Sequence, residues 1–160
     1  RRLHAIGILA RAAGSRGMVG GQAIDLAAVG GGATFDASSL EDMHLRKTGA
    51  LIRAAATVGA VLAGGSDDAI AAVDTYAREL GLAFQIIDDI LDVEGSNDAL
   101  GKTAGKDAAA GKPTFPSLHG LAESKALAAA CIDRAHAALA GRGLQGRLDE
   151  IADWSLSRRT

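Results

Sequence analysis

Three carboxylates and an amide occupy one face of an otherwise apolar segment, Phe84 to Asp92. With about 100° of rotation per residue in a helix, Gln85, Asp88, Asp89 and Asp92 fall within an arc of roughly 100°. Burying ionised carboxylates without partners is costly, so something positive must lie against them. Mg²⁺ prefers carboxylate oxygens and keeps waters and substrate phosphates as its other ligands. The sequence therefore predicts that Asp88, Asp89 and Asp92 bind Mg²⁺.

A solvated polar stripe on a surface helix is the alternative interpretation of this face. Two observations count against it. Apolar residues flank the stripe on both sides, Ile86 and Ile90 on one and Ile87 and Leu91 on the other. The carboxylates also share one sign, whereas a solvated face usually intersperses lysine or arginine. Metal binding is the favoured hypothesis.

Several lysines could neutralise a phosphate group beside such a metal. Lys47 lies in helical register with Met43 and Leu51, so it should point inward, where an ammonium needs an anion. Lys102 and Lys112 follow glycines in a polar segment, and lysine is a common phosphate ligand. Ordinary loop solubility is the alternative for these two.

The elements that must position these residues are all predicted to be helices. Apolar spacing and glycine breaks predict helices over about 1–13, 17–28, 38–63, 66–93, 113–139 and 144–156, with a loop over 95–112. Ser38 and Glu41 form a capping box for the third helix. Gly20 and Gly21 inside the second helix indicate a helix boundary or a close backbone approach. The predicted architecture is an all-α helical bundle.

Composition excludes several classes of function. The chain has 160 residues, 17 basic and 19 acidic, with a net charge of −2, which gives no support to nucleic-acid binding or a polybasic membrane patch. No 18-residue uncharged apolar run is present, so we expect no membrane span. The single Cys131 excludes an internal disulfide and favours a cytoplasmic location. The chain begins without Met and within a helical pattern, and we expect it to be a portion of a longer protein.

Five motifs, in this order, resemble the trans-type polyprenyl diphosphate synthases, most closely the C-terminal portion of a bacterial farnesyl diphosphate synthase. They are Gly17–Gln22, Lys47–Leu51, Phe84–Asp92, Gly101–Lys102 and Gly111–Pro116. The resemblance covers essentially the whole chain, so residues 1–160 would be the C-terminal portion of one polyprenyl synthetase domain. It implies a helical bundle of the isoprenoid synthase type.

The resemblance also implies an activity: Mg²⁺-dependent condensation of isopentenyl diphosphate with an allylic diphosphate, either geranyl or dimethylallyl. In that reaction Asp88 chiefly, with Asp89 and Asp92, would bind Mg²⁺. The remaining roles would be allylic diphosphate binding by Lys47 and Lys102, carbocation stabilisation by Thr48 and Gln85, and further substrate contacts by Gln22 and Lys112. The intact enzyme would be a homodimer.

Part of the family pattern is absent. The family's first aspartate-rich motif lies upstream of Gly20, and no acidic residue precedes Gly17 here. The N-terminal pocket for isopentenyl diphosphate is absent too, and Arg158–Arg159 match the family's basic tail only loosely. We therefore expect the isolated chain to be inactive. Three other hypotheses remain: a non-catalytic helical partner of a synthase, a class I terpene synthase, and a plain helical scaffold.

Overall fold

The computed structural model describes residues 1–28, 35–98, 112–144 and 146–158, and within these ranges every regular element is a helix. The elements are α1 (Arg2–Ala13), α2 (Met18–Ala28), α3 (Ala37–His44), η1 (Leu45–Gly49), α4 (Ala50–Ala63), α5 (Asp67–Asp98), α7 (Phe115–His119), α8 (Leu121–Leu139) and α9 (Arg147–Ser157). The all-α prediction is confirmed.

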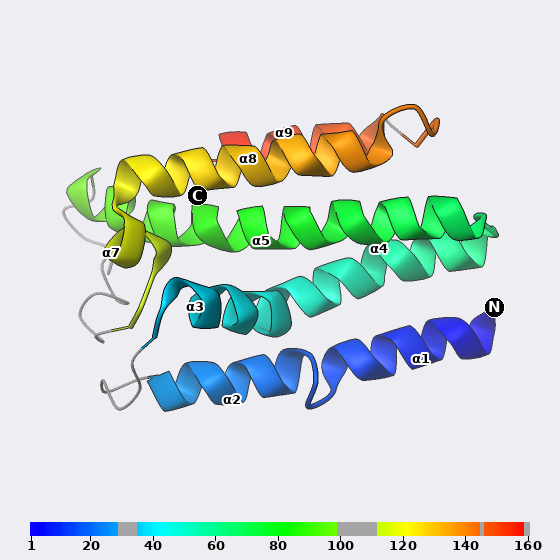
Figure 1. Ribbon diagram of the computed structural model, residues 1–160, viewed down its shortest axis with the longest axis horizontal. Coiled ribbons are helices and arrows are strands. Elements are labelled where there is room, and N and C mark those ends of the chain that lie inside the picture. Colours follow the sequence, from blue (N-terminus) through cyan, green and yellow to red (C-terminus); the bar gives the residue numbers. More distant parts are fainter. Residues whose placement is uncertain (29–34, 99–111, 145, 159–160) are drawn as a thin grey trace.

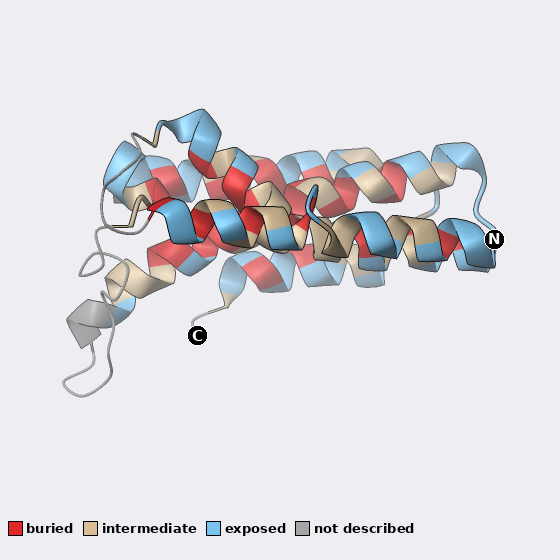
Figure 2. Cartoon of the chain, turned by 90° about the horizontal axis from the view of Figure 1, so that it is seen from below, coloured by how far each residue is buried: buried red, intermediate tan, exposed pale blue. Residues whose placement is uncertain are grey.

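The helices lie in layers along a common long axis (Figure 1). Helix α8, with α9 behind it, covers one side of α5; α4 and α3 cover the other side, and α1 and α2 form the outermost layer. Buried residues concentrate where the layers meet (Figure 2), and Leu40, Tyr76, Ile86 and Leu139 are among the largest fully buried side chains. Helix α5 is thus the central element on which the candidate site is built.

Helix α5 forms where the sequence predicts it and runs further. The Ser66 hydroxyl accepts the Ala69 N–H at 3.2 Å, and Asp67 and Asp68 follow in the first turn, where the helix dipole favours anions. Val73 and Ile87 lie on its buried apolar face. The helix continues to Asp98, five residues past the predicted end.

The predicted helix over 38–63 is wrong in two respects. It is three elements, because a π-helical turn, η1, interrupts it between α3 and α4. Its N-cap is Asp36, whose carboxylate accepts both the Ser39 N–H at 2.8 Å and the Ser38 hydroxyl at 2.9 Å. Ser38 therefore supports the cap instead of providing it, since the helix already begins at Ala37 and Asp36 accepts the Ser39 amide of its first turn.

Two further boundaries differ from the sequence prediction. The helix predicted over 113–139 is divided into α7 and α8 at Gly120, whose φ of 80° is a left-handed conformation that interrupts an α-helix. The last helix begins at Arg147, three residues later than predicted.

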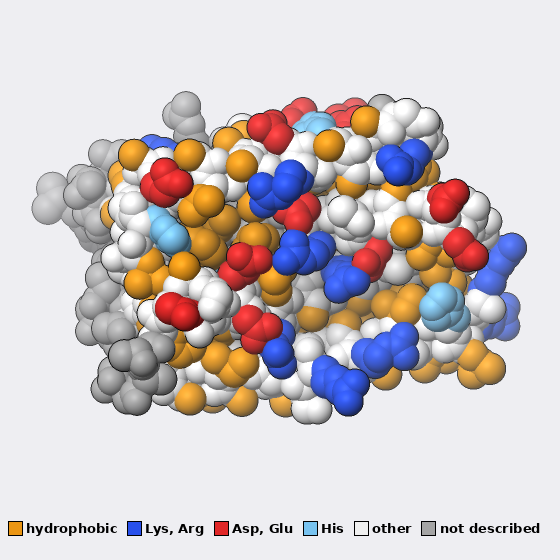
Figure 3. Space-filling view, viewed as in Figure 1, with side chains coloured by type: hydrophobic (Ala, Val, Ile, Leu, Met, Phe, Trp, Pro, Cys, Tyr) orange, Lys and Arg blue, Asp and Glu red, His pale blue; other side chains and the backbone are white. Residues whose placement is uncertain are grey.

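The outer layer exposes apolar side chains. Leu3, Ile6 and Leu9 of α1 and Val19 and Leu26 of α2 are all more than half exposed. Figure 3 shows basic side chains gathered over the middle of this face and apolar ones along its lower edge, where α1 and α2 lie. In the described ranges, none of the helices combines the length and the apolar character needed to cross a membrane.

Candidate functional site

A polar cavity of about 300 Å³ lies where α2, α3, η1 and α5 meet the segment before α7. Its lining combines two lysines, three aspartates, a histidine and a glutamine with three less polar or apolar residues. These are Lys47, Lys112, Asp25, Asp88, Asp89, His44, Gln85, Met43, Pro113 and Thr114. Most of the residues that the sequence nominated for chemistry therefore surround one cavity.

Two lysines converge on one buried carboxylate at this cavity. Lys47 Nζ donates to Asp25 Oδ2 at 2.8 Å, and Lys112 Nζ lies 3.3 Å from both Asp25 oxygens. Burial raises the pKa of Asp25, but the hydrogen bond and charge of Lys47, together with those of Lys112, outweigh burial, so the pKa lies below its ordinary value. Asp25 is thus an anion at neutral pH, and it provides the negative charge that we expect beside the inward-pointing Lys47.

The local backbone explains how Lys47 reaches this position. Lys47 and Thr48 belong to the π-helical turn η1, and such single turns often occur at functional sites. Helix α2 packs directly against that turn at Gly21, where an added Cβ would lie 2.2 Å from the Lys47 backbone nitrogen. The close backbone approach predicted for the Gly20–Gly21 pair is therefore present at Gly21, and it brings Asp25, one turn further along α2, to the lysine.

Thr48 and Gln85 are also brought together. The Thr48 hydroxyl donates to Gln85 Oε1, linking η1 to α5 across the edge of the site. Gln85 is 9% exposed and lines the cavity. The family resemblance implies that both residues act at one reacting centre, and in the structure they are direct hydrogen-bond partners.

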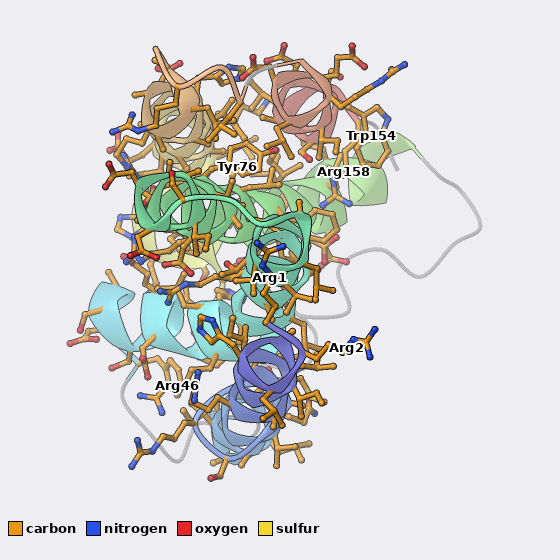
Figure 4. The ribbon with its side chains drawn as sticks, turned by 90° about the vertical axis from the view of Figure 1, so that its right-hand side faces the viewer. Arg1, Arg2, Arg46, Tyr76, Trp154 and Arg158 are labelled. Carbon is orange, nitrogen blue, oxygen red and sulfur yellow. The ribbon has the colours of Figure 1, made fainter. Side chains whose placement is uncertain are left out.

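Asp88 faces a basic group from the far end of the chain. Arg158 Nη2 lies 3.3 Å from Asp88 Oδ1 and donates to the Phe84 carbonyl at 3.0 Å. Its guanidinium also stacks over the Phe84 ring, 3.9 Å from the centroid. Figure 4 shows Arg158 reaching from the end of α9 toward α5. The Asp88 side chain remains 59% exposed, so this contact leaves carboxylate surface accessible.

Asp89 lies in a different environment from its neighbour. Its side chain is 7% exposed, and Oδ2 accepts the Phe115 N–H at 2.9 Å. His44 Nε2 lies 3.6 Å from the same oxygen. Asp92, one turn after Asp88 and Asp89, is intermediate in burial.

The described residues contain no group of three histidine, cysteine or acidic side chains placed to hold a metal ion. The predicted three-aspartate Mg²⁺ site is therefore not assembled in this conformation, and it stays a prediction. Lys102 lies outside the described residues. Gln22 is half-buried on α2 and is not among the residues that line the cavity.

Two contributors were missed or underweighted by sequence reasoning. Asp25 was not among the residues predicted for the site, although its spacing of one turn from Gly21 is the signal that could have identified it. Arg158 was only loosely matched to a basic tail, and its contact with Asp88 spans 70 positions of sequence.

The arrangement suits a ligand that is anionic and binds metal. The Lys47 and Lys112 side chains are 33% and 25% exposed and line the cavity, and lysine is a common phosphate ligand. Asp88 offers hard oxygen ligands on the same wall. Because Mg²⁺ in phosphate sites is commonly held by one or two carboxylates plus substrate phosphates, this donor set fits the ion without a third protein ligand.

Comparison with known proteins gives one consistent family. A family model described as polyprenyl synthetase matches residues 2–140. Geranylgeranyl pyrophosphate synthase 7 of Arabidopsis thaliana, a chloroplastic protein, is 47% identical over 143 residues, which are 88% of this chain and 41% of that protein. The chain thus spans less than half the length of this relative.

Solved structures share the fold. An FPP/GFPP synthase from Zymomonas mobilis is 37% identical with a TM-score of 0.78, over 96% of this chain and 50% of that one. A geranyltransferase from Helicobacter pylori, complexed with magnesium and isoprenyl diphosphate, is 29% identical with a TM-score of 0.76, over 96% of this chain and 50% of that one. The predicted isoprenoid synthase type of bundle is confirmed by these neighbours.

Proposed function

The chain belongs to the polyprenyl synthetase family, a family of prenyltransferases, and we propose from this premise that it forms the allylic diphosphate half of a prenyl diphosphate synthase. In this proposal an allylic diphosphate, geranyl or dimethylallyl, occupies the cavity and loses diphosphate, and isopentenyl diphosphate attacks the resulting cation. The observation that carries the proposal is the convergence of Lys47 and Lys112 on a cavity walled by the carboxylates of α5.

The residues of the cavity have different proposed roles. Lys47 and Lys112 bind the diphosphate oxygens as point charges, with Asp25 holding both ammonium groups in place. The Gln85 carbonyl oxygen, fixed by the Thr48 hydroxyl, lies at the cavity wall, where an oxygen dipole stabilises positive charge on an allylic carbon. Lys102 is proposed as a further diphosphate ligand and Gln22 as a further substrate contact, both from the family resemblance.

The proposed cofactor is Mg²⁺, held chiefly by Asp88; the family resemblance offers Asp89 and Asp92 as further candidate ligands. When bound, it neutralises charge on the leaving diphosphate. Arg158 then competes for the Asp88 carboxylate, because its Nη2 lies 3.3 Å from Oδ1. The Helicobacter pylori neighbour, complexed with magnesium and isoprenyl diphosphate, supports this choice of ion.

The proposed product is a short-chain prenyl diphosphate. The family resemblance implies a short-chain product such as farnesyl diphosphate, whereas the relative is named for geranylgeranyl pyrophosphate and the neighbour for FPP and GFPP. We propose a homodimer for the complete enzyme, and we propose that these 160 residues alone do not turn over, since the sequence holds only one aspartate-rich motif.

Calorimetric titration of the chain with inorganic diphosphate tests the proposed site. We expect binding that strengthens at least tenfold on adding Mg²⁺. In a Lys47→Gln variant we expect binding to weaken by about tenfold, because a charge-assisted phosphate contact is lost. Lys125→Gln is the matched control, since Lys125 pairs with Glu94 on the surface. Equal affinity in Lys47→Gln and wild-type protein would exclude Lys47 as a ligand.

The alternatives give different outcomes in the same system. A non-catalytic partner or plain scaffold predicts no diphosphate binding at all. A class I terpene synthase predicts the same Mg²⁺-dependent binding but a hydrocarbon product instead of an elongated diphosphate, so product analysis separates it from the proposed function.

A further inference from the structure

His44 is a buried histidine whose polar atoms are poorly satisfied. The residue is 6% exposed, and among the described residues neither ring nitrogen has a hydrogen-bond partner. Its ring stacks on Phe115, with centroids 5.6 Å apart and planes 20° apart. Because buried polar groups are normally paired, the Asp89 carboxylate is a candidate partner, with Oδ2 3.6 Å from Nε2.

The Asp89 carboxylate is already engaged on the side that faces this histidine. The oxygen nearest His44, Oδ2, accepts the Phe115 N–H at 2.9 Å. The Asp89 side chain is 7% exposed, whereas that of Asp88, the preceding residue, is 59% exposed. Two adjacent aspartates of one motif therefore occupy different environments, one accessible to solvent and one enclosed by protein groups.

The groups around Asp89 come from the segments that carry the two lysines. His44 ends α3, one turn before Lys47, and Phe115 begins α7, three residues after Lys112. Asp89 on α5 thus links the two segments whose ammonium groups meet at Asp25. A displacement of Asp89 would therefore move both lysines relative to α5.

We propose that Asp89 is a positioning residue and not a metal ligand: together with His44 and the Phe115 amide it forms an internal strut that sets the places of Lys47 and Lys112. The inference rests on the proposed function for the role of those lysines, but the strut itself is defined by protein groups alone. Asp88 is then the residue of this adjacent pair that provides ligand oxygens.

Two measurements on the 160-residue chain separate a strut from a ligand. The first is Mn²⁺ binding, followed by the electron paramagnetic resonance signal of the free ion, since carboxylate sites for Mg²⁺ also accept Mn²⁺. Asp88→Asn should weaken Mn²⁺ binding at least tenfold, whereas Asp89→Asn should change it by less than twofold. Equal losses in the two variants would overturn the proposal.

The second measurement is thermal unfolding, which requires no metal. Asp89→Ala leaves the buried Phe115 amide without its acceptor and removes the carboxylate beside His44, and it should lower the midpoint by roughly 5–10 °C. Asp89→Asn keeps an acceptor oxygen and should recover at least half of that loss. A midpoint for Asp89→Ala within 1 °C of wild type would overturn the proposal.

A double-mutant cycle tests the contribution of His44. His44→Phe retains a ring that can stack on Phe115 but removes the nitrogens, so its effect should be smaller in the Asp89→Ala background than in wild type. Strictly additive shifts would remove His44 from the strut. If wild-type chain bound no Mn²⁺, the metal part of the proposed function would fail, while the two unfolding comparisons would still decide the strut.

Discussion

Gly21→Ala tests whether the site depends on the contact between the backbones of α2 and η1. An added Cβ would lie 2.2 Å from the Lys47 nitrogen, 2.6 Å from its Cα and 2.8 Å from the Arg46 carbonyl carbon. All three atoms belong to the backbone, so no side-chain rotation can relieve the overlap. Helix α2 must instead move away from η1 by about 1 Å before an ordinary contact distance is restored.

The expected cost follows from this geometry. Overpacking of a fixed core contact costs about 1–3 kcal/mol, and the upper part of this range applies because backbone must move. Replacing a helical glycine by alanine returns about 0.5–1 kcal/mol. The net loss of about 2 kcal/mol corresponds to a fall of roughly 4–8 °C in the unfolding midpoint for a chain of this size.

Gly59→Ala is the matched control. Gly59 lies within α4, and an added Cβ there meets nothing within 4 Å among the described residues. The same substitution should therefore raise the free energy of unfolding by about 0.5–1 kcal/mol. Both variants are compared with wild type by circular dichroism at 222 nm during heating and urea unfolding.

The binding site supplies a second readout. Because Asp25 and Gly21 share α2, moving that helix lengthens the contact between Asp25 and Lys47, which is 2.8 Å in the native site. Inorganic diphosphate should bind Gly21→Ala more weakly than Gly59→Ala. A Gly21→Ala chain that melts at or above the wild-type midpoint and binds diphosphate equally well would refute the reasoning.

Two further predictions concern ionisable groups. Asp25→Asn should destabilise the chain by roughly 1–3 kcal/mol at pH 7, because it leaves two partly buried ammonium groups without their carboxylate. The control is Asp42→Asn on the surface, which should cost less than about 0.5 kcal/mol. Since the folded pKa of Asp25 is lowered, its contribution is fully present above the unfolded pKa near 3.8 and is lost as pH falls through the folded value. The stability difference between wild type and Asp25→Asn should therefore hold from pH 7 to about 5 and shrink below pH 4, and a pH-independent difference would contradict the assignment. Burial raises the pKa of Cys131 to about 11, although the charge of Arg134 opposes this shift. The native chain at pH 8 should therefore react with a disulfide reagent at least about 100-fold more slowly than the urea-unfolded chain. Equal rates would show that Cys131 is accessible.

Local sequence patterns predicted most helices because their apolar faces repeat at helical spacing. The same patterns did not show the π turn at Leu45–Gly49, because Met43, Lys47 and Leu51 keep an ordinary helical spacing in the sequence across it. The cap was assigned to Ser38 because its motif is complete in sequence, but in the structure the helix begins earlier, at Ala37, and Asp36 accepts the Ser39 N–H.

The site was predictable in residue type but not in pairing. The carboxylates of α5 and the inward orientation of Lys47 follow from helical geometry alone. The pairing of Lys47 with Asp25 depends on how α2 packs on other helices. The contact of Arg158 with Asp88 depends in the same way on the packing of α9. Such contacts between distant segments are set by the tertiary structure, which no local spacing contains.

The most direct test of the account is product formation by a complete fold that contains this chain. We would join residues 1–160 to the upstream half of the Zymomonas mobilis FPP/GFPP synthase, since this chain covers 50% of that protein. The fusion would be incubated with Mg²⁺, isopentenyl diphosphate and geranyl diphosphate, and products identified by mass. The account predicts an elongated prenyl diphosphate, at least 100-fold less of it from a Lys47→Gln fusion, and none from the chain alone. A cooperatively folded fusion that binds diphosphate but forms no elongated product would contradict it.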